Sequence, residues 1–224
     1  MTNEQIDGLI DQLNTAAGSA VIIPRALTEK VAVAHVWPRD LSDYIQVSPD
    51  RFFFVKADGR DYVGAVQDGG PSDMHVYIKR DFRGQGILAT ALDDVIFPWL
   101  AQVDGRSEQR LTFQEPKVKR HFAGRLGFRS TGELSSRRSL QAYRKRCVDF
   151  VPSPSITAAA FADMKQRLDR ASQWVEMVRV QVESHGLGRD GSKTAADLRK
   201  ALNCLGGLDD RIRYDANDAQ GIWL

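Results

Sequence analysis

The stretch MHVYIKRDFRGQGILATALDDVIFPWL, residues 74 to 100, changes its hydrophobic period near its middle. In its first part Val76 and Ile78 alternate with more polar neighbours, as in a half-buried strand. In its second part apolar residues recur every three or four positions, as on one face of a helix: Leu88, Leu92, Val95, Ile96, Trp99 and Leu100. The stretch therefore predicts a strand, a turn at residues 83 to 86 and an amphipathic helix.

The turn itself has features that suit an anion. Gly84 and Gly86 lack side chains, so a ligand can reach backbone N–H groups that the first turn of a helix leaves unpaired. The positive end of the helix dipole and the cations of Arg80 and Arg83 add to the attraction. We expect this turn to hold a diphosphate group. The glycines alone would equally suit a plain strand-to-helix turn without a ligand.

A second interpretation of the turn is a dinucleotide-binding loop. Gly84, Gly86 and Ala89 have the spacing of such loops, and Asp104 lies near the position at which they place an acidic residue. That fold requires a parallel strand–helix–strand unit around the turn. The residues before the turn therefore decide between the two interpretations.

The sequence before the turn predicts antiparallel strands. Phe52–Val55 and Tyr62–Val66 flank the turn-prone residues 57 to 60 and are expected to form a hairpin. A second turn at residues 68 to 72 leads into the strand Met74–Lys79. Three antiparallel strands in a row do not open a parallel unit, which argues against the dinucleotide fold.

Residues 83 to 88 have the sequence RGQGIL, and residues 121 to 128 have the sequence HFAGRLGF. The first resembles the Arg/Gln-x-x-Gly-x-Gly/Ala signature of the GNAT superfamily, the acetyl-CoA-dependent N-acetyltransferases, although Leu88 departs from its sixth position. The second is similar to the late helix of that family and to the Leu-Gly-Phe that starts its sixth strand. The resemblance covers about residues 21 to 146. It implies an α+β fold with a mixed, mostly antiparallel seven-stranded sheet flanked by helices.

The resemblance also implies acetyl-CoA as the cofactor and an amine as the acceptor. In the family the turn holds the diphosphate, and the backbone of the preceding strand holds the pantetheine and the acetyl carbonyl. The matching positions in this sequence are Ile78, Lys79, Arg80, Arg83, Gly84, Gln85, Gly86, Ile87 and Leu88. The implied reaction is direct transfer of the acetyl group, and the resemblance leaves the acceptor open.

Acetyl transfer needs a base for an ammonium acceptor, donors for the oxyanion and an acid for the departing thiolate. Asp73 and His75, near the start of the strand before the turn, are the candidate bases, and His121 is the candidate acid. The Tyr and Asn that the family often carries correspond here to Ala123 and Pro116. These departures favour a second hypothesis, a catalytically degenerate binding or assembly protein that acts through its C-terminal helices.

The remaining elements follow the order of the family. We expect a helix over residues 3 to 17, a strand Ala20–Ala26, a helical region Thr28–Tyr44, a strand Arg110–Gln114, a helix Lys117–Arg125, and strands Phe128–Thr131 and Ser139–Arg144. In the family the strand after the central helix splays away from the strand before it to admit the cofactor. Residues 1 to 147 are thus predicted to form one acetyltransferase-like domain.

Charge and composition narrow the class of protein. The net charge is +2, yet residues 102 to 147 hold twelve Lys and Arg against four Asp and Glu. A basic block can bind nucleic acid, but a solvated face with cofactor contacts is the favoured interpretation. Cys147 and Cys204 are isolated and the four His are scattered, so no disulfide framework and no metal site are expected. No apolar run is long enough to cross a bilayer and the acidic start is unlike a signal peptide, so we expect a cytoplasmic protein without a membrane segment.

The last third is predicted to be a separate helical hairpin. Residues 148 to 156, which include Pro-Ser-Pro-Ser, are predicted to be a linker, and residues 157 to 224 are predicted to form the hairpin. Seven apolar residues then recur at alternating spacings of three and four, as in a coiled coil: Phe161, Met164, Leu168, Ala171, Val175, Val178 and Val182. A second helix is expected from Lys193 to about Ile212. The seam suits a homodimer or another protein partner, and it equally suits a single amphipathic helix lying on the domain.

Overall fold

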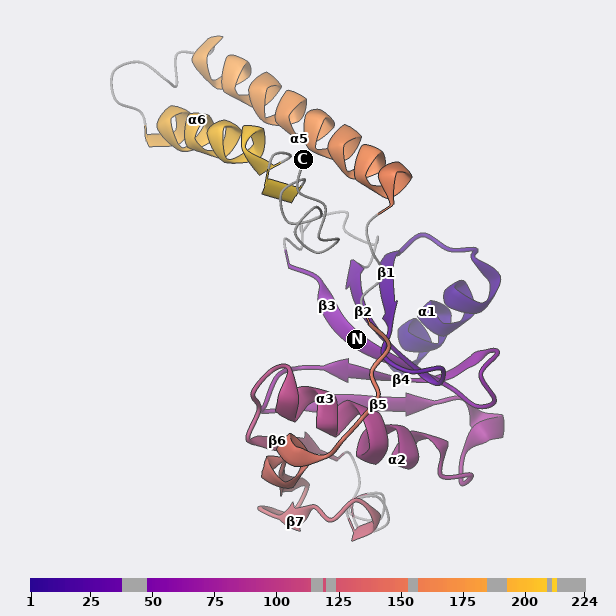
Figure 1. Cartoon of the computed structure of the whole chain (residues 1–224). Helices are drawn as coiled ribbons and strands as arrows, with labels where there is room; N and C mark the ends of the chain where they lie inside the picture. Colours follow the sequence, from indigo (N-terminus) through magenta and orange to yellow (C-terminus); the bar gives the residue numbers. More distant parts are fainter. Residues whose placement is uncertain are drawn as a thin grey trace. The chain divides into compact units, whose positions relative to one another are not determined.

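A computed structural model of the chain describes residues 1–37, 48–113, 119, 124–152, 157–184, 193–208 and 211–212. The chain divides into two compact units, residues 1–152 and residues 153–224 (Figure 1). Each unit is described by itself.

The first unit contains a five-stranded antiparallel sheet in which each strand pairs with the next along the chain. Its strands are β1 (Val21–Ala26), β2 (Val31–Trp37), β3 (Asp50–Lys56), β4 (Tyr62–Asp68) and β5 (Met74–Ile78). The predicted hairpin is confirmed as β3 and β4, with Phe54 opposite Ala65. The strand before the glycine turn is confirmed as β5.

Both faces of this sheet are covered, because consecutive aromatic residues of β3 point in opposite directions. Phe52 and Phe54 pack with the helix α1 (Asn3–Thr15), which confirms the predicted N-terminal helix. Phe53 packs on the other face with the helix that follows the turn. The two faces therefore support two separate clusters of buried residues.

The helix after the turn is continuous from Ile87 to Gln102 but changes its hydrogen bonding midway. It consists of α2 (Ile87–Ala91), the π-helical segment η2 (Leu92–Ile96) and α3 (Phe97–Gln102). Pro98 accounts for the change, because it has no N–H and its ring crowds the carbonyl four residues earlier. The N–H of Phe97 accordingly donates to Leu92, five residues back. The predicted amphipathic helix is confirmed, and its apolar face is buried.

A second, three-stranded sheet follows. Its strands lie in the order β6 (Glu108–Thr112), β8 (Ser135–Ser139) and β7 (Arg129–Ser130), all antiparallel. The expectation of seven strands in one sheet is wrong, since the described strands form one sheet of five and another of three. The α+β class with mostly antiparallel strands is confirmed.

The two sheets are joined at the start of β5. The N–H of Arg110 donates to the carbonyl of Pro71 at 3.0 Å, and the N–H of Thr112 donates to the Asp73 carboxylate at 3.1 Å. The Asp73 carboxylate thus accepts a hydrogen bond that a backbone carbonyl would accept in a continuous ladder. This substitution ends the ladder within the described residues and explains why the strands do not form a single sheet.

Two predicted elements are wrong. Within the region Thr28–Tyr44, residues 31 to 37 form the strand β2 instead of a helix, and residues 38 to 44 lie outside the described residues. A strand buried on both faces has the same unbroken apolar sequence as a short buried helix. The strand Ser139–Arg144 is replaced by the 3₁₀ segment η3 (Gln141–Lys145), which keeps the buried Leu140 and Tyr143 three positions apart on one side. The expected helix Lys117–Arg125 lies mostly outside the described residues.

The second unit is a pair of helices, α5 (Ala158–Ser184) and α6 (Lys193–Gly206), which lie side by side and run in opposite directions (Figure 1). An ion pair of 3.1 Å between Arg199 and Glu183 joins them. Six of the seven seam residues are half-buried, and Val178 is exposed. Within the described part of the chain, no helix is both long enough and apolar enough to cross a membrane.

Candidate functional site

The candidate site is the turn between β5 and α2. After the short 3₁₀ segment η1 (Arg80–Phe82), Arg83 is extended and the chain then reverses through Gly84 and Gly86. Their φ angles are +79° and +78°, in the left-handed region that costs other residues about 1–2 kcal/mol. The glycines are thus required by the shape of the turn.

The start of α2 presents backbone N–H groups at this turn for which no described residue is an acceptor. The first hydrogen bond of the helix runs from the N–H of Thr90 to the carbonyl of Gly86, at 2.9 Å. The three N–H groups between them therefore have no acceptor within the helix. They point out of the helix end, where the dipole favours negative charge.

A pocket of about 130 Å³ opens beside these donors. It is lined by Ile78, Phe82, Arg83, Gly84, Gly86, Ile87, Leu88, Ala89 and Arg125. Six of these residues are among the nine predicted cofactor-binding positions. Arg125 was missed, although it belongs to the HFAGRLGF segment. Its Nη2 atom lies 2.7 Å from the place that a Cβ on Gly86 would occupy, so it brings a second cation to the turn.

Ile78 contributes its backbone to the open edge of β5. The N–H of Lys79 donates to Val63 at 2.9 Å, and the neighbouring pair in the register is Ile78 opposite Gly64. In an antiparallel ladder hydrogen-bonded pairs alternate with pairs whose N–H and C=O groups point away. Ile78 therefore directs its N–H and C=O away from β4, and Arg83 Nε donates to that carbonyl at 3.3 Å.

Lys79 does not contribute in the same way. Its N–H is already paired, and its ammonium lies 2.5 Å from Asp11 and 3.3 Å from Asp7 of α1. Partial burial would lower the pKa of Lys79, but the hydrogen bonds and charges of these two carboxylates outweigh it and raise the pKa. Lys79 thus lies on the α1 face of the sheet, opposite the face that α2 covers.

The other predicted cofactor-binding residues differ in their roles. Arg80 is exposed, and its carbonyl accepts the Arg83 N–H at 3.2 Å, which closes the 3₁₀ segment. Gln85 donates to the carbonyl of Asp81 at 2.9 Å and braces the turn. Gln85 and Ile87 also line a second pocket of about 670 Å³, formed by α2 with the ends of β2 and β3 and with Asp149 and Val151. The first turn of α2 therefore separates two cavities.

Neither Asp73 nor His75, the two predicted bases, is brought to the pocket at the turn. His75 is half-buried on the α1 face, with Nε2 2.9 Å from Asn3 Oδ1. Burial, and then the charge of the chain's amino terminus, lower the pKa of His75. Asp73 is exposed and accepts the Thr112 N–H. His121 lies outside the described residues.

Within the described ranges, no three His, Cys, Asp or Glu side chains gather in a way that could hold a metal ion. Comparisons of the chain with protein-family models, with curated proteins and with solved structures found no match.

Proposed function

We propose that this chain is a GNAT-like N-acetyltransferase that transfers an acetyl group directly from acetyl-CoA to an amine. The observation that carries the proposal is the convergence of unpaired α2 donors, Arg83 and Arg125 at one glycine turn beside the outward-facing amide of Ile78. This arrangement supplies donors and positive charge for a diphosphate at one end. At the other end, the N–H of Ile78 is a backbone donor for the acetyl carbonyl.

The described residues divide the binding work between them. The turn and its two arginines would hold the diphosphate, and the Ile78 N–H would donate to the acetyl carbonyl and to the oxyanion that develops from it. The paired N–H of Lys79 is unsuitable for that purpose. The separation of β5 and β6 into different sheets supports entry of an extended cofactor between them.

A second candidate function is a non-catalytic binding or assembly protein. It is favoured by one observation: among the described residues that line the pocket at the turn, the titratable side chains are Arg83 and Arg125, and neither can serve as a base at neutral pH. Asp73 and His75 have partners elsewhere. In this alternative the protein would act through α5, which exposes Trp174 and Met177.

One experiment separates the two candidates. Calorimetric titration of the full chain with acetyl-CoA tests the cofactor site, and a thiol-release assay with a panel of small amines, peptides and aminoacyl-tRNA tests transfer. Binding with release of CoA supports the enzyme. Binding without release supports the non-catalytic protein, and the absence of binding contradicts the site itself.

A further inference from the structure

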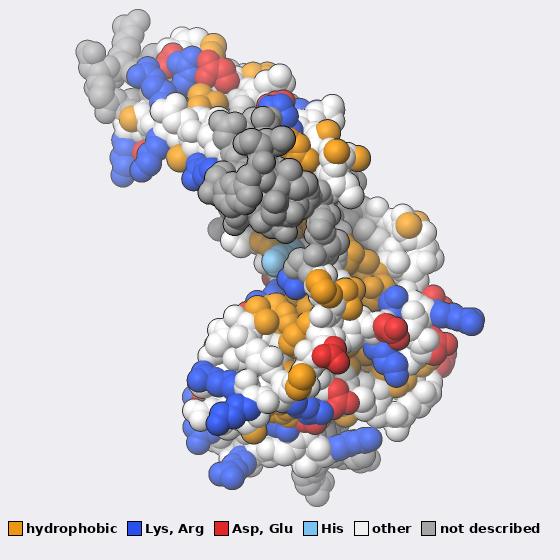
Figure 2. All heavy atoms as spheres, in the orientation of Figure 1, with side chains coloured by type: hydrophobic (Ala, Val, Ile, Leu, Met, Phe, Trp, Pro, Cys, Tyr) orange, Lys and Arg blue, Asp and Glu red, His pale blue; other side chains and the backbone are white. Residues whose placement is uncertain are grey.

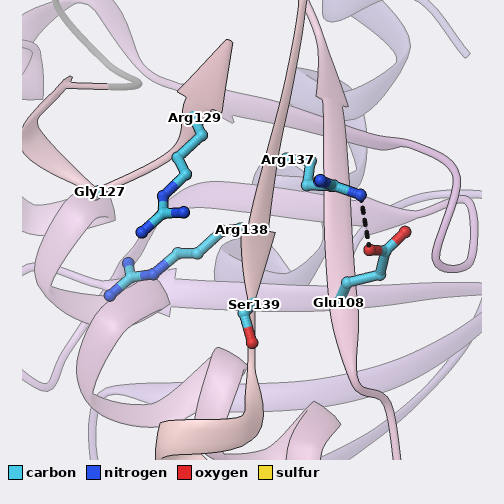
Figure 3. A pocket seen from close by; sticks show the side chains of 6 residues that line it. All are labelled: Glu108, Gly127, Arg129, Arg137, Arg138 and Ser139. Atoms are coloured by element: carbon cyan, nitrogen blue, oxygen red, sulfur yellow. Dashed lines mark ion pairs between the residues drawn. The ribbon is translucent and has the colours of Figure 1, made fainter. Parts of the chain in front are cut away.

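The second sheet carries a pocket of its own, away from the glycine turn. It has a volume of about 380 Å³ and is lined by Glu108, Gly127, Arg129, Arg137, Arg138 and Ser139 (Figure 3). We call it the basic pocket. None of the described residues lines both this pocket and the pocket at the turn. Figure 2 shows Lys and Arg side chains gathered over the part of the first unit that holds β6 and β7.

The strand register places three arginines in one row across this sheet. Arg137 of β8 is directly opposite Arg110 of β6 on one side and directly opposite Arg129 of β7 on the other. All three are exposed on the same face. Like charges that are directly opposite destabilise a sheet, so the packing of the strands gives no reason for this row.

The carboxylates near the row compensate only part of its charge. Glu108 is shared, because it lies 3.2 Å from Arg110 and 3.7 Å from Arg137. Arg129 forms no ion pair with any described residue. The mouth of the basic pocket therefore has an excess of positive charge.

Arg138 forms a fixed wall of the pocket. Its guanidinium lies 2.9 Å from Asp93 and stacks over the rings of Phe97 and Tyr143, at 5.2 and 5.0 Å from their centroids. Figure 3 shows Arg129 and Arg138 extending toward the same side, whereas Arg137 turns toward Glu108. The pocket thus offers guanidinium groups in two places, and one of them is held in position before a ligand arrives.

We propose that the basic pocket binds a small diphosphate-bearing molecule, with one phosphate group between Arg129 and Arg138 and the other on Arg137. Guanidinium groups match phosphate oxygens with paired hydrogen bonds, and the volume falls within the range of small-molecule sites. Among the described residues, the lining contains no aromatic side chain that could stack on a base. Recognition therefore rests on the phosphate groups. A competing occupant is the backbone of a nucleic acid, which would spread over the whole row.

The test uses inorganic pyrophosphate as the probe and the full chain labelled with ¹⁵N. The amide signals of Gly127, Arg129 and Ser139 should shift on titration, and the dissociation constant from those signals should rise about tenfold or more in Arg129→Gln. Because the signals are local, pyrophosphate that binds at Gly84 and Gly86 is recognised separately. Shifts confined to those two glycines would overturn the proposal.

Two further variants make the test specific to the pocket. Glu108→Gln removes the carboxylate that competes for Arg137, so it should tighten pyrophosphate binding about two- to fivefold. Arg110→Gln is the matched control, because Arg110 lies in the same row and pairs with the same Glu108 but does not line the pocket; its effect should be small. Equal weakening by Arg110→Gln and Arg129→Gln, or a short oligonucleotide that binds tighter than pyrophosphate and depends on Arg110, would assign the row to nucleic acid and overturn the proposal.

Discussion

The guanidinium of Arg125 lies 2.7 Å from the position that a Cβ on Gly86 would occupy, whereas no described residue beyond its chain neighbours has an atom within 4 Å of the corresponding position on Gly84. Both glycines have positive φ angles, so Ala at either position should lower the stability of the first unit by about 1–2 kcal/mol. Only Gly86→Ala should also displace Arg125. Acetyl-CoA affinity, measured by calorimetry, should therefore fall more in Gly86→Ala than in the matched Gly84→Ala.

Gly86→Asp is the stronger form of the same change. The new carboxylate would lie where the diphosphate is expected and within reach of Arg125, so binding of acetyl-CoA should be abolished while the fold is retained. Circular dichroism checks the fold and calorimetry checks the binding. An unchanged affinity in Gly86→Asp would remove the cofactor from this turn.

Arg83 is expected to contribute to the diphosphate and not to the 3′-phosphate. Arg83→Ala removes a guanidinium that lines the pocket and donates to Ile78, so acetyl-CoA binding should weaken by about 1.5–3 kcal/mol. CoA and dephospho-CoA should weaken equally, as measured by parallel titrations. A loss limited to CoA would place Arg83 on the 3′-phosphate instead. Arg80→Ala is a suitable control, because Arg80 is an exposed neighbour that does not line the pocket.

The sequence predicted the turn well because its signals are local. The change from period 2 to period 3.6 and the two glycines are enough to specify a strand, a left-handed turn and a helix within residues 74 to 100. Ile78, Arg83 and Gly86 were accordingly found at the pocket. Two features of the site could not be predicted, because they depend on contacts between distant segments. Arg125 approaches Gly86, and the N–H of Lys79 donates to the carbonyl of Val63.

The alternation of side chains between the two faces of a strand explains why the predicted bases are not at the pocket. Position along the chain put Asp73 and His75 near the turn, but residues of a strand alternate between faces. Met74, Val76 and Ile78 belong with the buried cluster beneath α2, whereas His75 contacts α1. The alternation of apolar and polar residues in β5 shows that His75 and Ile78 lie on opposite faces of the sheet. It does not show which of the two faces the helix after the turn covers, and that face is the one on which the pocket lies.

Asp68 should make the first unit sensitive to acid. Its side chain is 1% exposed and lies 2.9 Å from Arg106, with Arg51 as a second partner. Desolvation alone would raise the pKa of Asp68, but the hydrogen bonds and charges of Arg106 and Arg51 outweigh it and lower the pKa. A lowered pKa stabilises the fold above the unfolded value of about 3.9, and this stability is lost as the pH falls through the folded value.

Asp68→Asn should therefore lower the free energy of unfolding at pH 7 by about 1.5–3 kcal/mol, because it removes the buried carboxylate that pairs with Arg106 and Arg51, while Asp104 stays 3.2 Å from Arg106. The difference from the unmodified chain should shrink at about pH 3. Urea unfolding at each pH, followed through the indole signal of Trp99 in the first unit, measures the difference in free energy. Glu108→Gln, which breaks exposed pairs, should change the free energy by less than about 1 kcal/mol. A difference that does not vary with pH would contradict the role of Asp68.

The helical pair should self-associate through the exposed side of α5. The seam residues Leu168 and Val175 are half-buried within the unit, so they are poor positions at which to test association. Trp174 and Met177, one turn apart on α5, are 67% and 54% exposed, and Val178 beside them is 45% exposed. An apolar stripe of this kind is typical of an interaction surface, and a second copy of the chain is a common way to bury it.

Light scattering should therefore find the unmodified chain as a dimer at micromolar concentration and the double variant Trp174→Glu, Met177→Glu as a monomer. The variant should bind acetyl-CoA with unchanged affinity, because the first unit alone contains the residues of the turn. Gln173→Glu is the matched control, since it adds a charge at an exposed position on the same helix turn without removing apolar surface; it should remain a dimer. A monomeric unmodified chain would contradict self-association and leave another protein as the partner for the stripe.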